Sequence, residues 1–187
     1  MLKALIPFLL LALTACHKDK NEITVPQSPD ENELITTLKL VYTDSAMGDT
    51  QTAIFRDIDG PGGNPPTQFD TIRLKTQTVY LAQIILLDES SAPIDTISNE
   101  VYEKRNEHQF FFTSTDAAIT TSYGDFDDNG VPLGLKLQMK TGMPTTGTAS
   151  TFTISLKHQG DQKPVSGTGN SSAGSTDIQI AFPLLIK

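Results

Sequence analysis

The stretch STFTISLKH, residues 150–158, decides the fold class, because apolar and polar side chains alternate along it. Successive side chains of a β-strand point to opposite faces, so this pattern predicts a strand with one face on a core and the other in water. Residues 133–139 and 177–186 show the same period of two. The apolar positions on the predicted inner faces are Leu133, Leu135, Leu137, Met139, Phe152, Ile154, Leu156, Ile178, Ile180 and Phe182.

Shorter runs rich in β-branched and aromatic residues predict further strands, because stretches rich in Gly, Pro, Asn and Asp separate them. Many short strands and little helix predict a single all-β domain over residues 34–187, an antiparallel β-sandwich or a barrel-like fold. The additional strands are expected at residues 34–42, 52–58, 71–75, 78–87, 108–113 and 118–123.

The segment SNEVYEKRNE, residues 98–107, is the candidate helix. A helix of two or three turns would use Ser98 as its N-cap and turn Val101 and Tyr102 toward the core. An extended segment is the alternative interpretation. Residues 60–66 and 160–175 are rich in glycine and in proline or serine, and we expect loops there.

The first sixteen residues have the pattern of an export signal. Lys3 gives a positive start, Ala4–Leu13 is apolar, and small residues precede Cys16. A membrane-spanning helix needs about 20 apolar residues, so this shorter run predicts a removable signal peptide over residues 1–15. The run LTAC, residues 13–16, resembles the lipobox of bacterial lipoproteins, in which the cysteine is lipidated before cleavage.

The lipobox resemblance implies that the mature protein begins at a lipidated Cys16 and is anchored to the outer membrane, facing the periplasm or exposed at the cell surface. One acyl chain holds a protein only marginally, since each buried methylene contributes about 0.8 kcal/mol, and a multiply acylated cysteine meets the requirement for stable anchoring. The rest of residues 16–33 is polar, charged and interrupted by proline, which predicts a flexible tether. The alternative is a secreted protein cut near Ala15 with a free cysteine.

The cysteine count and the charge exclude several classes of function. Cys16 is the only cysteine, so the mature domain has no internal disulfide, no CxxC redox pair and no Cys-rich zinc site. The chain has 22 acidic and 14 basic residues, a formal charge of −8. Phosphate backbones repel an acidic surface, so we expect no nucleic-acid partner. With no tryptophan and 7% aromatic residues, a stacking platform for sugars or bases would have to use few residues.

Five segments of the chain carry a family resemblance: NELITTL (32–38), IILLDES (84–90), EHQFFF (107–112), LKH (156–158) and GSTDI (174–178). They resemble a group of Bacteroidota lipoproteins of uncharacterised activity, often labelled "type 1 periplasmic binding fold superfamily protein". The resemblance spans nearly the whole mature domain and implies export and lipidation. The label implies two doubly wound α/β lobes, for which this sequence has neither alternating helical periods nor sufficient length.

The segment DFDDNG, residues 125–130, matches the first half of an EF-hand calcium loop. Asp125, Asp127 and Asn129 stand at alternate positions, from which oxygen ligands can converge on a calcium ion. The second half departs from the pattern, because Lys136 stands where a bidentate glutamate is expected. A tight turn, for which the Asn-Gly pair is suited, is the alternative interpretation, and the two can coexist.

His108 and His158 are the histidines of the predicted domain. His108 follows Glu107 at the start of one strand, and His158 ends another strand shortly before Asp161. If strand pairing brings the two rings together, a site with two histidines and a carboxylate could bind zinc or a similar metal. Isolated hydrogen-bonded histidines at strand ends are the alternative.

We expect no enzymatic activity, because the sequence shows neither an activated nucleophile nor a telling pair of acid and base. The leading hypothesis is a non-enzymatic, outer-membrane-anchored module that binds a protein or a small ligand, for instance as an accessory to a nutrient-uptake receptor. The alternative is a metal-binding lipoprotein that holds calcium or zinc. No other cofactor is expected.

Overall fold

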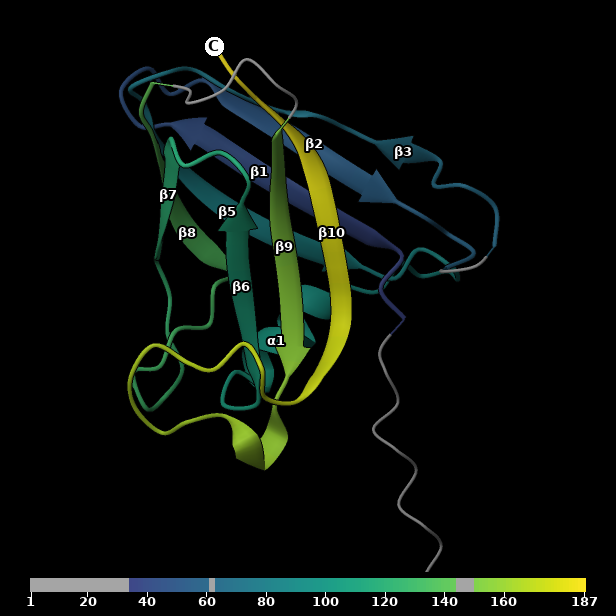
Figure 1. Ribbon diagram of the computed structural model, residues 1–187. Coiled ribbons are helices and arrows are strands. Elements are labelled where there is room, and N and C mark those ends of the chain that lie inside the picture. Colours follow the sequence, from purple (N-terminus) through teal and green to yellow (C-terminus); the bar gives the residue numbers. More distant parts are fainter. Residues whose placement is uncertain (1–33, 61–62, 144–149) are drawn as a thin grey trace, which may run out of the picture. The chain divides into compact units, whose positions relative to one another are not determined.

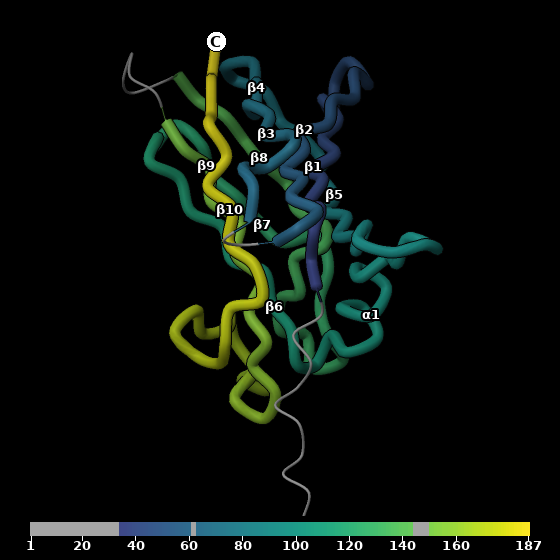
Figure 2. The backbone as a smooth tube through the Cα atoms, turned by 90° about the vertical axis from the view of Figure 1, so that its right-hand side faces the viewer, coloured from purple at the N-terminus to yellow at the C-terminus, as the bar shows by residue number. Residues whose placement is uncertain are grey.

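The computed structural model describes residues 34–60, 63–143 and 150–187. These residues belong to one compact unit and form two β-sheets that pack face to face. In Figure 1 the strands β6, β9 and β10 lie in front of β1, β2 and β5 and cross them obliquely; Figure 2 shows the two layers edge-on. The prediction of an all-β sandwich is confirmed.

The larger sheet has six strands, and every neighbouring pair in it is antiparallel. β1 and β5 form its centre, so their inner faces carry much of the core. In spatial order the strands are β3 (Gln68–Phe69), β2 (Thr50–Arg56), β1 (Thr37–Asp44), β5 (Val79–Leu87), β8 (Lys136–Thr141) and β7 (Ile119–Tyr123).

The smaller sheet has four strands, and one of its pairings departs from the expected antiparallel pattern. β4 runs parallel to β10, whereas β10–β9 and β9–β6 are antiparallel. β4 follows β3 after only Asp70 and Thr71 and crosses from one sheet to the other, so its direction is set by this crossing and not by a hairpin. The strands in order are β4 (Ile72–Leu74), β10 (Ser175–Ile186), β9 (Ser150–His158) and β6 (His108–Ser114).

The core lies between the two sheets and follows the alternation seen in the sequence. Along β9 the side chains of Phe152, Ile154 and Leu156 are buried, and the residues between them are more exposed. The predicted strand over 133–139 begins only at Lys136, although the alternate leucines before it are buried as expected. Gly134 has a φ of +95°, a conformation that interrupts the strand there.

The predicted helix forms as α1 (Ile97–Glu103), but two of its expected details are wrong. Its N-cap is Thr96, which makes no side-chain capping bond; the Ser98 hydroxyl instead accepts a hydrogen bond from the backbone N–H of Leu86 on β5. Val101 is buried as predicted, whereas Tyr102 is exposed. The helix is short and buries one narrow stripe, so the residue after Val101 is rotated toward solvent.

Two short elements were not predicted, β3 and the 3₁₀ turn η1 (Gly160–Gln162), because both are too brief to show a period. In the described ranges no helix is long and apolar enough to cross a bilayer. The predicted signal peptide, Cys16 and the tether lie outside the described residues.

Candidate metal centre

The pairing of β6 with β9 brings His108 and His158 together. They are direct partners in the register of these antiparallel strands, followed inward by Phe110 and Leu156. The two imidazoles therefore share the inner face of the smaller sheet with these buried residues, at the end of the core. Their ring centroids are 4.5 Å apart.

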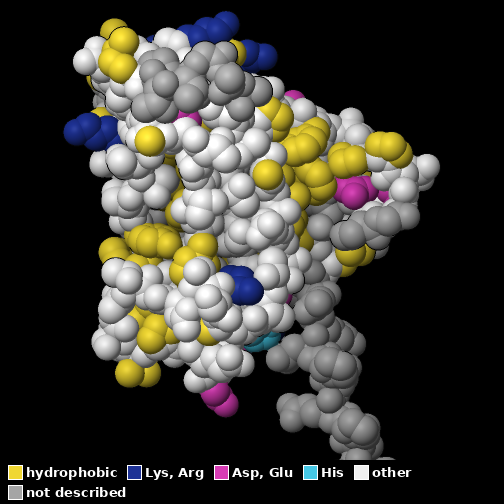
Figure 3. Space-filling model, in the orientation of Figure 1, with side chains coloured by type: hydrophobic (Ala, Val, Ile, Leu, Met, Phe, Trp, Pro, Cys, Tyr) yellow, Lys and Arg dark blue, Asp and Glu magenta, His cyan; other side chains and the backbone are white. Residues whose placement is uncertain are grey.

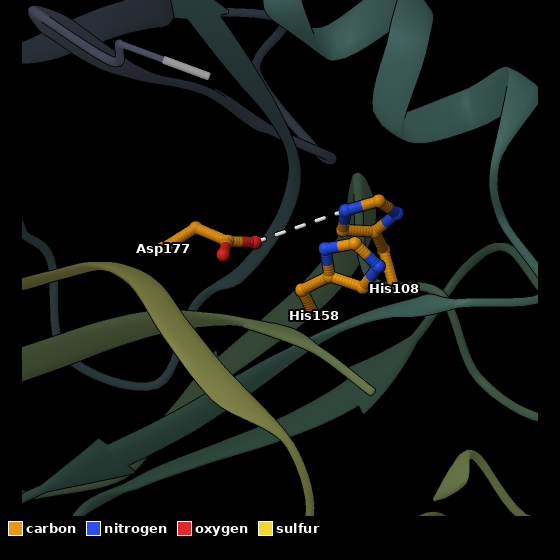
Figure 4. Close-up of side chains that lie close together, drawn as sticks. All are labelled: His108, His158 and Asp177. Atoms are coloured by element: carbon orange, nitrogen blue, oxygen red, sulfur yellow. Dashed lines mark ion pairs between the residues drawn. The ribbon is translucent and has the colours of Figure 1, made fainter. Parts of the chain in front are cut away.

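A β-bulge in β10 supplies a carboxylate to the same place. Thr176 pairs with Lys157, and Ile178 pairs with Leu156, so Asp177 is an extra residue between two ladder positions. A bulge redirects a side chain that regular alternation would place elsewhere. The Asp177 carboxylate consequently points toward the two imidazoles (Figure 4).

The separations of the three side chains suit a metal ion. One potential ligand atom from each of His108, His158 and Asp177 lies within 4.8 Å of the other two, and Nε2 of His108 is 3.7 Å from Oδ2 of Asp177. Tetrahedral zinc, with ligands at about 2.0–2.1 Å, separates neighbouring ligand atoms by roughly 3.3 Å. Small side-chain rotations would close the remaining gap.

The contacts around the two rings are those that orient metal-binding histidines. Nδ1 of His108 lies 3.1 Å from the carbonyl oxygen of Lys104, at the end of α1. In protein metal sites, the ring nitrogen that does not bind the ion usually donates to such a carbonyl or to a carboxylate, which directs the other nitrogen at the metal. Oε2 of Glu107 lies 3.5 Å from Nε2 of His158, so a second carboxylate stands beside the cluster.

The cluster is mostly covered but still reached by solvent. The side chains of His108, His158 and Asp177 are 5%, 16% and 10% exposed. Figure 3 shows histidine atoms at the surface near the lower end of the smaller sheet. An ion can therefore enter, whereas a larger substrate would find little of the ligand set accessible.

The calcium-like segment folds as a tight turn whose carboxylates accept backbone hydrogen bonds. Oδ1 of Asp127 accepts the N–H groups of Asn129 and Val131, each at 2.9 Å. Oδ1 of Asp125 accepts the N–H of Gly134 at 2.8 Å. These bonds give both aspartates a structural role in the turn.

A lysine ammonium already neutralises Asp127. Nζ of Lys163 lies 2.9 Å from Oδ2 of Asp127. Burial opposes ionisation of this carboxyl, but Lys163 and the backbone N–H groups of Val131 and Asn129 outweigh it and hold the pKa of Asp127 below its ordinary value. Burial raises the pKa of Asp125. The Lys163 ammonium therefore occupies the place beside Asp127 where a calcium ion would bind.

The structure thus brings together two of the five predicted metal ligands, His108 and His158, and places the other three, Asp125, Asp127 and Asn129, in a separate turn. The carboxylate in the cluster is Asp177, which the sequence did not single out. The sequence around Asp177 shows only the alternation of a strand. A bulge has no sequence pattern of its own here, so the position of Asp177 could not be predicted.

Comparisons with protein-family models, with curated proteins and with solved structures found no match. Two imidazoles and one carboxylate can hold a divalent transition metal and leave a fourth position for water or an incoming ligand.

Proposed function

We propose that this protein is a lipid-anchored protein of the cell envelope that acts by binding and not by catalysis, and that a divalent transition metal ion such as zinc is its ligand. The observation that carries the proposal is the convergence of His108, His158 and Asp177 from three strands. His108 on β6 and His158 on β9 are direct partners in the pairing of these two strands. Asp177 comes from the β-bulge in β10.

The chemistry of the ligands favours zinc over calcium. Imidazole nitrogen is a good ligand for zinc, copper and nickel, whereas calcium takes oxygen ligands, and usually six to eight of them. Three protein ligands leave an open position, which suits capture of an ion from solution and its release to another ligand. The three side chains are mostly buried, which leaves room for an ion but not for a larger ligand.

The location and the partners are proposed from the N-terminal sequence. A lipidated Cys16 would hold the domain at the outer membrane, outside the cytoplasm. There it would act on ions in the periplasm or at the cell surface, in association with an envelope protein such as a nutrient-uptake receptor. The acidic charge of the chain argues against a nucleic-acid partner.

The test uses residues 21–187, freed of metal by a chelator and then titrated with zinc in a calorimeter. We expect one zinc ion per chain, bound with micromolar affinity. A free zinc concentration of 100 times Kd adds about 2.7 kcal/mol to the stability, which raises the melting temperature of a domain of this size by roughly 5–10 °C.

Variants separate this site from adventitious binding. His158→Ala and Asp177→Ala should each lose the calorimetric signal and the melting shift. Asp161→Asn, an exposed carboxylate close to His158 in the sequence, is the matched control and should bind zinc as the unaltered protein does. The proposal fails if zinc, copper and nickel give neither heat nor a melting shift, or if His158→Ala binds zinc undiminished.

A further inference from the structure

A pocket of about 530 Å³ lies where α1 and the turn after β7 meet the larger sheet. One wall is the face of α1 that carries Ser98, Asn99, Tyr102 and Glu103. A second wall includes Phe126 of the turn. The volume falls within the range of small-molecule binding sites, roughly 300–1,000 Å³.

Two exposed aromatic side chains line this pocket. Tyr102 is 54% exposed and Phe126 is 51% exposed. Large apolar groups left in water on two walls of one pocket indicate a surface that a ligand covers. The guanidinium of Arg105 lies 5.2 Å from the centre of the Tyr102 ring and holds the ring in place by a cation–π contact.

The two walls are tied together before any ligand binds. Arg105, just beyond α1, donates to Oδ1 of Asp128 in the turn, through Nε at 2.9 Å and Nη2 at 2.5 Å. The Asn106 side chain donates to Oδ2 of Asp128 at 3.0 Å and accepts the backbone N–H of Asp128 at 3.1 Å. These bonds set the spacing of Tyr102 and Phe126, so little ordering is needed when a ligand enters.

Three exposed polar side chains line the pocket together with Tyr102 and Phe126. Within the part of the chain that the structure describes, the side chains of Gln83, Asn99 and Glu103 form no hydrogen bond or ion pair. Two amides and a carboxylate offer both donors and acceptors to a ligand rich in hydroxyl groups.

The pocket continues along the outer face of the larger sheet. A second depression, of about 480 Å³, shares Gln83 and Lys136 with the first. It runs over Val41, Leu81 and Gln138, whose side chains project away from the core. The two depressions adjoin at these shared residues, and together they are called the groove; a ligand made of several linked units would extend from one to the other.

We propose that this groove binds a neutral oligosaccharide, with sugar rings stacked on Tyr102 and Phe126 and hydroxyl groups bonded to Gln83, Asn99 and Glu103. A sugar ring has an apolar face of C–H groups and a rim of hydroxyls, which matches aromatic walls around amide and carboxylate groups. The pocket is lined by two carboxyl groups, of Glu103 and Asp125, and by one ammonium, of Lys136, so this balance disfavours an acidic ligand. This site is separate from the metal cluster and does not depend on it.

The test measures binding of four defined neutral probes, maltohexaose, cellohexaose, xylohexaose and mannohexaose, to the metal-free domain by calorimetry. We expect at least one to bind with a Kd of about 1 mM or tighter. Tyr102→Ala and Phe126→Ala should each weaken that binding by about tenfold, because each removes a stacking ring. Tyr102→Phe keeps the ring and should retain most of the affinity.

Controls separate the groove from the fold and from the metal cluster. Ile94→Ala removes an apolar side chain of similar exposure, 58%, outside the groove and should leave binding unchanged. His158→Ala should also bind the saccharide normally, whatever it does to zinc binding. The inference is overturned if none of the four probes binds at about 10 mM, or if the bound probe is unaffected by both alanine variants in the groove.

Discussion

Lys163 and Asp127 form a buried ion pair in which the two side chains are 1% and 0% exposed and Nζ lies 2.9 Å from Oδ2. The same ammonium donates to the carbonyl oxygen of Arg105 at 2.6 Å. Lys163 belongs to the loop after β9, whereas Asp127 lies in the turn after β7 and Arg105 follows α1. Lys163 therefore links its own loop to two others that are far from it in the sequence, the turn after β7 and the segment after α1.

Lys163→Met should lower the free energy of unfolding by about 3 kcal/mol, because it leaves the Asp127 carboxylate buried without its partner. Asp128→Asn, which removes the exposed Arg105–Asp128 pair, should cost much less, because solvent screens that pair, and is the matched control. Denaturant unfolding of both variants measures the difference. Equal losses in the two variants would show that the buried pair has no special role.

Gly174→Ala should destabilise the domain by about 3 kcal/mol, since a positive φ and a backbone clash both oppose a side chain there. Gly174 has a φ of +72°, and a Cβ would lie 2.0 Å from the carbonyl oxygen of His158. The variant should also weaken zinc binding, because it displaces the end of β9. Gly167→Ala, at a φ of +92° with open space around it, should cost about 1 kcal/mol.

The pH dependence of stability should include a contribution from Asp44. Hydrogen bonds from the backbone N–H of Ala46, and then the ammonium of Lys75, favour its charged form and hold the pKa of Asp44 below its ordinary value of 3.8. A carboxyl whose folded-state pKa is depressed stabilises the fold above the unfolded pKa, and this stabilisation is lost as the pH falls through the folded pKa.

Asp44→Asn should therefore be less stable than the unaltered protein at neutral pH, and its stability should fall less steeply below about pH 4. Denaturant unfolding at a series of pH values from neutral to acid checks this. Parallel curves for the two proteins would contradict the assignment of Asp44.

Cys16→Ser should release the protein from the membrane fraction, because the hydroxyl cannot carry the thioether-linked lipid of a lipoprotein. Fractionation of cells that express the full chain, together with mass spectrometry of the mature N-terminus, measures the change. Retention of residues 1–15 in the native protein, or an unlipidated Cys16 at its membrane-bound N-terminus, would disprove the anchor.

Local pattern was sufficient for the strands and for most of the core. Alternation along 150–158 and 177–186 placed β9 and β10, because the period of two is a property of each strand by itself. The same reasoning failed for Tyr102, whose direction depends on which stripe of a seven-residue helix meets β5. It also missed the parallel pairing of β4 with β10, because the sequence of a strand does not specify which strand lies beside it.

The sequence by itself determined an all-β domain and marked His108 and His158 as candidate ligands. Only the tertiary structure decided that the two rings meet, because their contact depends on the register between β6 and β9. It also decided that Asp177 completes the cluster, through a bulge that arises only when β10 is paired with β9. Side-chain direction along a strand is local, whereas the alignment of one strand against another is a property of the packed sheet.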